Sequence, residues 1–177
     1  MNDILTALVE SRTVDARLDI EGGDLVLTMT HDLPCSPEEA FALITDPAMT
    51  ATWSPVVADR ALDSVGPASS RETPTDPDVD AEVLSVNPPR RVRHRWGSDV
   101  LDWEIRPHEA GTRVVLHDTL ADPTTASSNA AGWHLCLAGL EARAQGHDVE
   151  RPVGAHAMGY GWEQLRDGYD VLFAQQA

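Results

Sequence analysis

The 177-residue sequence contains no lysine, so all 13 of its basic residues are arginines, and they are outnumbered by 29 acidic residues. Without lysine, Schiff-base catalysis and phosphate binding by a Walker-type lysine are both excluded. The formal net charge of −16 also argues against nucleic acid or an anionic membrane as a general partner. Binding to phosphate groups requires a basic face.

Cysteine is scarce as well, since Cys35 and Cys136 are the only two. They form no CxxC motif and belong to no His/Cys cluster, so we expect no disulfide framework, metal site or cofactor. The sequence also lacks GxSxG, HExxH and Gly-rich phosphate motifs. Nothing in it therefore requires an enzyme.

Long apolar runs are absent too. No stretch approaches the length of a membrane-spanning helix, and the N-terminus lacks the basic segment and apolar run of a signal peptide. We expect a cytoplasmic protein without a membrane partner. A chain of this length is long enough to form one domain with a substantial core.

The clearest element in the sequence is a helix around residues 131–144. Apolar residues at spacings of three and four place one face of this helix toward a core: Trp133, Cys136, Leu137, Leu140 and Ala144. Because the chain before it is mostly strand-like, we expect this face to pack on a sheet. His134 points away from Trp133, so we expect it at the surface.

Shorter patterns predict the other elements. Ser36 is expected to cap a helix, with Pro37 at its first position and Glu39 completing a capping box. The expected helices cover residues 2–10, 37–45, 47–53 and 155–173. The expected strands cover residues 13–20, 25–31, 56–65 and 79–86, and residues 66–78 form a loop.

Three further strands, at residues 90–96, 99–106 and 112–120, are the most informative. The two-residue Gly97-Ser98 turn fixes the register of the first pair. It places Trp96 opposite Asp99, His94 opposite Leu101, Arg93 opposite Asp102, Val92 opposite Trp103 and Arg91 opposite Glu104.

Alternation then assigns the residues of these strands to two faces. The inward face is mostly apolar and consists of Val92, His94, Trp96, Leu101, Trp103 and Ile105. If Trp103 pairs with Val114, the third strand adds Val114, Leu116 and Asp118 to this face. The outer face would then hold a charge ladder, Arg91–Glu104–Arg113.

Several short motifs occur in a characteristic order. They are SPEEAFALITDP at residues 36–47 with Trp53, PPRRV at 88–92, WEIRP at 103–107, GTRV at 111–114 and Gly132-Trp133. Together they resemble the SRPBCC (START-like, Bet v 1-like) superfamily over about residues 25–145. Within that superfamily, the chain most resembles bacterial relatives of the activator of the heat-shock-protein-90 ATPase.

The resemblance implies an α+β helix-grip fold, in which a seven-stranded antiparallel sheet wraps around a long C-terminal helix and encloses an apolar cavity. It transfers no catalytic residue, because the superfamily shares none. We expect residues 1–177 to form one such domain. Its extensions, residues 1–24 and 147–177, either cap the pocket or form the contact of a homodimer.

The predicted ligand-binding residues line this expected cavity: Trp53, Val92, His94, Trp96, Leu101, Trp103, Leu116, Trp133 and Leu137. The tryptophans suit either an aromatic ligand or a filled core. His94 and Asp118 are the inward polar residues and the candidates for catalysis. The alternatives are a core histidine satisfied by a neighbour and an aspartate solvated at the rim of the sheet.

Three functions are consistent with these features. The leading hypothesis is a protein that binds a small hydrophobic or aromatic molecule. The second is a cyclase, aromatase or hydrolase in which His94 transfers a proton together with Asp118 or a nearby carboxylate. The third is an interaction protein that resembles a chaperone cofactor.

Overall fold

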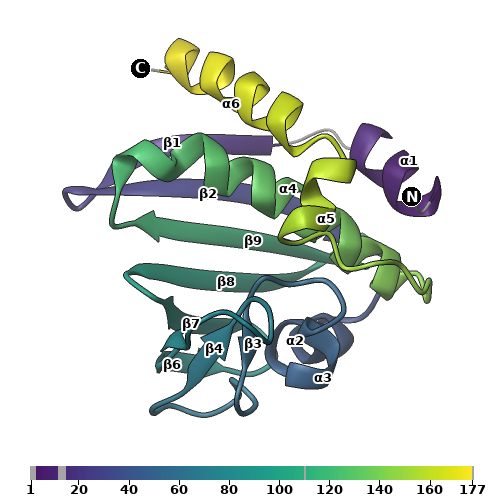
Figure 1. Ribbon diagram of the computed structural model, residues 1–177. Coiled ribbons are helices and arrows are strands. Elements are labelled where there is room, and N and C mark those ends of the chain that lie inside the picture. The colour runs from purple at the N-terminus through teal and green to yellow at the C-terminus, as the bar shows by residue number, and fades with distance from the viewer. Residues whose placement is uncertain (1–2, 12–14, 110, 177) are drawn as a thin grey trace.

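The computed structural model describes residues 3–11, 15–109 and 111–176. An antiparallel sheet and a long helix dominate it (Figure 1). The strands are β1 (Asp15–Glu21), β2 (Asp24–Leu33), β6 (Val83–Asn87), β7 (Arg91–Trp96), β8 (Asp99–His108) and β9 (Gly111–Leu120). They lie in the order β1-β2-β9-β8-β7-β6, and α4 (Ala126–Ala144) crosses one face. This is the predicted α+β helix-grip architecture.

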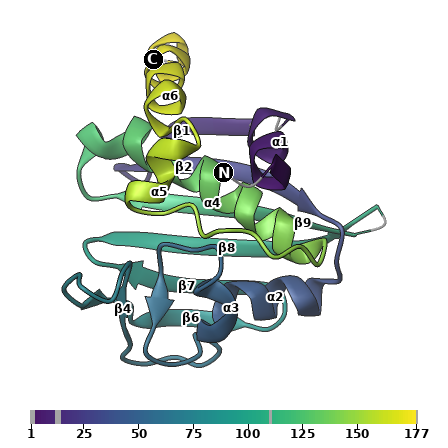
Figure 2. The same ribbon diagram turned by 45° about the vertical axis from the view of Figure 1, so that its right-hand side comes forward.

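The remaining elements surround this core. They are α1 (Asp3–Ser11), α2 (Pro37–Thr45), α3 (Pro47–Thr50), β3 (Val57–Ala58), β4 (Ser69–Arg71), β5 (Val79–Asp80), the 3-10 turn η1 (Pro123–Thr125), α5 (Ala155–Gly159) and α6 (Trp162–Gln176). Figure 2 shows α2 and α3 on the β6 side of the sheet, opposite the side where α6 lies.

The helix start at Ser36 is confirmed. The Ser36 hydroxyl accepts a hydrogen bond from the Glu39 N–H at 3.2 Å, and the Glu39 carboxylate accepts one from the Ser36 N–H at 2.9 Å. These two bonds form the predicted capping box and satisfy backbone donors that a helix N-terminus otherwise leaves free.

Several predicted boundaries were wrong. Within the described residues the main sheet has six strands instead of seven, because β3, β4 and β5 form a separate small sheet. The strand expected at 56–65 is only Val57–Ala58, and the loop expected at 66–78 contains β4. The last helix is divided near Gly161, whose φ of 82° does not continue a helix. Predictions for Asn2, Thr13 and Val14 lie outside the described residues.

The register of the β7–β8 hairpin is confirmed at all the predicted pairs, from Trp96 opposite Asp99 to Arg91 opposite Glu104. The predicted β8–β9 register was shifted by two residues, since Trp103 pairs with Leu116 and not with Val114. The cause is the length of the pairing, because β8 continues to His108, which lies opposite Gly111. A shift of two keeps every side chain on its predicted face.

The shift does remove the expected charge ladder. Arg113 lies opposite Arg106 instead of Glu104. Arg91 instead binds Asp102 through two hydrogen bonds, from Nε at 2.9 Å and from Nη2 at 2.6 Å. The outer face therefore remains charged, with a different set of ion pairs.

Helix α4 is buried on more than the face that packs on the sheet. Residues 133–140 are all buried, because α1 and the C-terminal segment cover the other side. A helix that is apolar around its whole circumference is typical of such a position. His134, expected at the surface, is only 4% exposed, and its ring nitrogens contact the Tyr169 Oη at 3.0 Å and the Val9 carbonyl at 3.1 Å.

Candidate functional site

An apolar cavity lies between α4, the end of β7 and the C-terminal segment. It has a volume of about 310 Å³. Its walls come from distant parts of the chain: Pro55, Glu72, Trp96, Ser128, Asn129, Gly132, Trp133, Cys136, Pro152, Val153, Gly154, Ala157, Met158 and Trp162. The cavity thus lies on the flank of α4, under residues 152–162, and not deep between α4 and the sheet.

Aromatic rings connect the cavity to the core. Trp96 and Trp133, which line it, pack edge to face with ring centroids 5.4 Å apart. Behind them, Trp103 packs against Trp133 at 5.5 Å and against Trp53 at 6.0 Å. Each edge-to-face pair stabilises the fold beyond the effect of burying the apolar surface of its rings. The aromatic wall is therefore held in place by the core.

Two connections hold the C-terminal segment over the cavity. The Gly154 N–H donates to Glu72 Oε1 at 3.0 Å, and Arg151 Nε donates to the Ser54 carbonyl at 2.7 Å. Gly154 has a φ of 55°, a conformation that glycine adopts without strain. Residues far apart in the sequence are thus brought together as one wall of the cavity.

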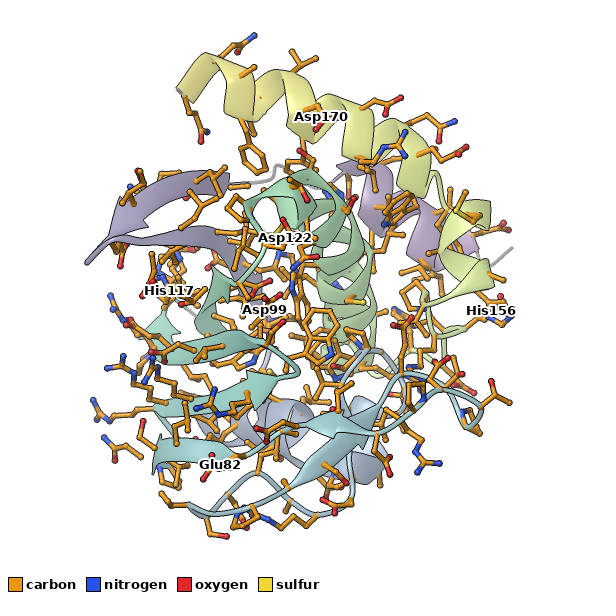
Figure 3. All side chains as sticks on the ribbon, turned by 60° about the vertical axis from the view of Figure 1, so that its left-hand side comes forward. Glu82, Asp99, His117, Asp122, His156 and Asp170 are labelled. Atoms are coloured by element: carbon orange, nitrogen blue, oxygen red, sulfur yellow. The ribbon has the colours of Figure 1, made fainter. Side chains whose placement is uncertain are left out.

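Asn129 forms a polar corner of the cavity. The Asn129 amide nitrogen donates to Asp118 Oδ2 at 3.1 Å and to Asp99 Oδ2 at 3.2 Å. Trp133 Nε1 donates to the same Asp118 oxygen at 3.2 Å. Asp99 is itself held by the Ala121 N–H, at 2.8 Å from Oδ1. In Figure 3, Asp99 lies beside α4, whereas His117 lies toward the outer face of the sheet and His156 lies out on α5.

Asp118 is fully buried, which corrects the expectation of a solvated position at the rim. In the observed register it lies between Leu27 and Leu101, and both of these side chains are fully buried. Burial raises the pKa of Asp118 to about 7, and the nearby Asp99 charge adds to this, while Asn129 and Trp133 oppose it. Its second oxygen, Oδ1, has no hydrogen-bond partner among the described atoms.

His94 is a buried core residue. It is 2% exposed, and its Nδ1 donates to the Arg95 carbonyl at 2.8 Å. Desolvation lowers the pKa of His94 to about 4, so the ring is neutral near pH 7. Leu101 separates it from Asp118 in the sheet. Two strand spacings correspond to about 10 Å, too far for a direct proton transfer between the two residues.

The predicted ligand-binding residues fall into two groups. Trp96 and Trp133 line the cavity. His94 and six apolar residues, each at most 2% exposed, are packed in the interior and are not part of its lining: Trp53, Val92, Leu101, Trp103, Leu116 and Leu137. The structure adds Asn129, Met158 and Trp162, which sequence reasoning missed. Asn129 is one helical turn before Trp133, and this spacing was the only available signal.

Among the described residues, no three His, Cys, Asp or Glu side chains are grouped closely enough to hold a metal ion. In the same part of the chain, no helix has the length and apolar character needed to cross a membrane.

The helix-grip fold and the cavity beside its long helix define the class of the protein. The chain belongs to the family described as polyketide cyclase / dehydrase and lipid transport, whose model matches residues 24–145. This confirms the SRPBCC assignment. The narrower resemblance to relatives of the heat-shock-protein-90 ATPase activator stays a prediction.

Solved structures agree on the fold. CalU16 from Micromonospora echinospora has a TM-score of 0.71 at 14% identity, covering 92% of this chain and 96% of its own. EF2215 from Enterococcus faecalis, a conserved protein of unknown function, has a TM-score of 0.70 at 15% identity, with 92% of each chain covered. DynU16, from the dynemicin biosynthetic locus, scores 0.61 at 19% identity, covering 70% of this chain and 48% of its own. No curated protein matches the sequence significantly.

Proposed function

We propose that the protein binds a small hydrophobic or aromatic molecule in the cavity between α4, Trp96 and the C-terminal segment. The observation that carries the proposal is an apolar wall of three tryptophans, Trp96, Trp133 and Trp162, around a volume of about 310 Å³. Ligand pockets are mostly apolar and have a few polar groups, and this volume is at the small end of their range. The cavity thus suits a molecule of one or two rings.

The family supports this proposal, because its description includes lipid transport and polyketide cyclisation. A structural neighbour, DynU16, is a protein of a biosynthetic locus. In this chain the extension after residue 147 supplies Pro152, Met158 and Trp162 to the wall. We therefore propose that residues 1–177 act as one binding unit, with the extension capping the pocket.

No observation favours the enzyme hypothesis over binding alone. Neither His94 nor Asp118 lines the cavity. His94 would have to act from the buried interior, whereas Asp118 reaches the cavity only through Asn129 and Trp133. A chaperone-cofactor role, a homodimer and a cytoplasmic location stay predictions from the sequence.

The experiment is to fill the cavity without disturbing the helix. Gly132 lines the cavity, and a Cβ built on it would meet only Trp162 Nε1, at 4.0 Å. Gly132→Leu therefore places a side chain against Trp162, and leucine also favours the helix over glycine. Gly168→Leu is the matched control, because a Cβ there meets nothing within 4 Å.

Ligand-observed NMR titrations with 2-naphthol then compare the two variants with the unmodified protein. We expect Gly132→Leu to weaken binding at least about tenfold, because it occupies the space needed by the ring. Gly168→Leu should bind like the unmodified protein. Equal affinity in all three proteins would contradict the proposed function, as would failure of the unmodified protein to bind 2-naphthol and its methoxy and carboxylate analogues.

A further inference from the structure

At the polar corner of the cavity, the two ends of the Asn129 amide have different partners. Asn129 lines the cavity, yet its amide nitrogen is used by two carboxylates, Asp99 and Asp118. An asparagine amide has two N–H donors and one carbonyl acceptor. With one donor on each carboxylate, both donors are consumed.

This arrangement also fixes the orientation of the amide. A flipped amide would turn its oxygen toward the Asp99 carboxylate, which only accepts, and the hydrogen bond between these two groups would be lost. The carboxylates are held in turn, Asp99 by the Ala121 N–H and Asp118 by Trp133 Nε1. Asn129 therefore has only its carbonyl oxygen left to offer a ligand.

The charges around this corner disfavour an anion. Asp99 lies behind Asn129, and Glu72 is the charged residue in the cavity lining. The lining contains no arginine or histidine among the described residues. Arg151 lies outside the lining, where its Nε donates to the Ser54 carbonyl and its charge interacts with Glu72. Its Nη2 is buried and has no hydrogen-bond partner among the described atoms. A ligand carboxylate would thus meet Glu72 in the lining and no cation among the described lining residues.

We infer that the cavity selects, among small aromatic molecules, those that carry a neutral hydroxyl or N–H donor, which the Asn129 carbonyl oxygen accepts. Phenols are the simplest class of this kind. Asn129 is then the specificity-determining residue, while the tryptophans supply affinity for the ring. The inference rests on the proposed function and goes beyond it by assigning the chemistry of the ligand.

Three probes of one ring system separate these contributions at pH 7. 2-Naphthol carries a donor, 2-methoxynaphthalene has the same ring and oxygen without the donor, and 2-naphthoate carries a negative charge. We expect 2-naphthol to bind about three- to tenfold more tightly than 2-methoxynaphthalene, the usual effect of one neutral hydrogen bond. We expect 2-naphthoate to bind more weakly than both.

Asn129→Leu keeps a side chain of similar volume without the acceptor, and Asn129→Ala is the alternative if that variant does not fold. In either variant the preference for 2-naphthol should fall to about onefold, whereas Gly168→Leu should retain it. Equal binding of 2-naphthol and 2-methoxynaphthalene, or a preference for 2-naphthoate, would overturn the inference and leave the proposed function standing. Failure of all three probes to bind would overturn both.

Discussion

Asp118 and His94 share one row of the inner sheet surface, with Leu101 between them, and burial acts on them in opposite directions. The pKa of Asp118 is raised to about 7, and the pKa of His94 is lowered to about 4. Both shifts favour the neutral form, as expected for ionisable groups among buried apolar residues. Each shift links the stability of the fold to pH.

Asp118 makes stability fall as pH rises. Between its ordinary pKa of 3.8 and its folded pKa of about 7, the folded state holds a proton that the unfolded state has released. Asp118→Asn keeps an acceptor for Asn129 and Trp133 and removes the titration. We expect the free energy of unfolding of the variant, measured in urea, to rise relative to that of the unmodified protein between pH 4 and pH 8, by at most about 4 kcal/mol. A difference that does not change with pH would contradict the burial of Asp118.

His94 makes stability fall as pH drops. Below its ordinary pKa of 6.5, the unfolded state binds a proton that the folded state refuses until about pH 4. His94→Asn keeps a donor for the Arg95 carbonyl and removes the titrating group. The smaller side chain leaves a cavity, which lowers the free energy of unfolding by the same amount at every pH. We expect the free energy of unfolding of the variant, measured in urea, to rise relative to that of the unmodified protein by at most about 3 kcal/mol as the pH falls from 7 to 4.

These two linkages oppose each other between about pH 4 and pH 6.5. In that range the two effects on the free energy of unfolding of the unmodified protein largely cancel. Each single variant removes one of them, so its free energy of unfolding changes with pH as the remaining residue dictates. If His94→Asn and the unmodified protein kept a constant difference over this range, the buried neutral histidine would be contradicted.

At the scale of elements, the edge strand β1 is closed by a side chain. The Gln176 amide, at the end of α6, accepts from the Leu18 N–H at 3.1 Å and donates to the Ala16 carbonyl at 3.2 Å. It thereby pairs with the edge of β1 as a neighbouring strand would. Unpaired strand edges promote association between chains, and covering them is a common protection.

Gln176→Ala removes this pairing. We expect the Leu18 amide to exchange its hydrogen roughly fivefold faster, which corresponds to the loss of about one hydrogen bond. The amides of Arg17 and Asp19 point toward β2 and should keep their exchange rates. Measurement is by native-state hydrogen exchange, and an unchanged Leu18 rate would mean that α6 does not end on β1 in solution.

Elements that follow from local chemistry could be predicted from the sequence. The Ser36 capping box and the Gly97-Ser98 hairpin depend on residues a few positions apart, and both are confirmed. The β8–β9 register depends on how far the pairing extends before the turn, and alternation alone cannot fix that length. For this reason the faces were correct and the pairs were shifted by two.

The site was harder to predict, because its walls come from segments far apart in the chain. Trp96 and Trp133 follow from alternation and helical spacing, whereas Asn129, Met158 and Trp162 meet them only through the fold of the C-terminal segment. That segment also buries His134, whose environment depends on Tyr169 and Val9. A single sequence gives no measure of such contacts.

At the scale of the whole molecule, the central question is where a ligand would bind. The sequence favoured the interior between sheet and helix, but the interior there is filled by side chains such as Trp53 and Trp103, which are 1% and 2% exposed. The cavity instead lies where the C-terminal segment closes over α4. Trp96, Trp133 and Trp162 therefore line the cavity, whereas Trp53 and Trp103 do not.

The most direct measurement is a ¹H–¹⁵N NMR spectrum of the five indole N–H groups, recorded with and without 2-naphthol. The largest shifts are expected for Trp96, Trp133 and Trp162, which line the cavity. Smaller changes are expected for Trp53 and Trp103, which lie in the core. The largest shifts at Trp53 and Trp103, or no shifts at saturating 2-naphthol, would contradict the binding site proposed for this protein.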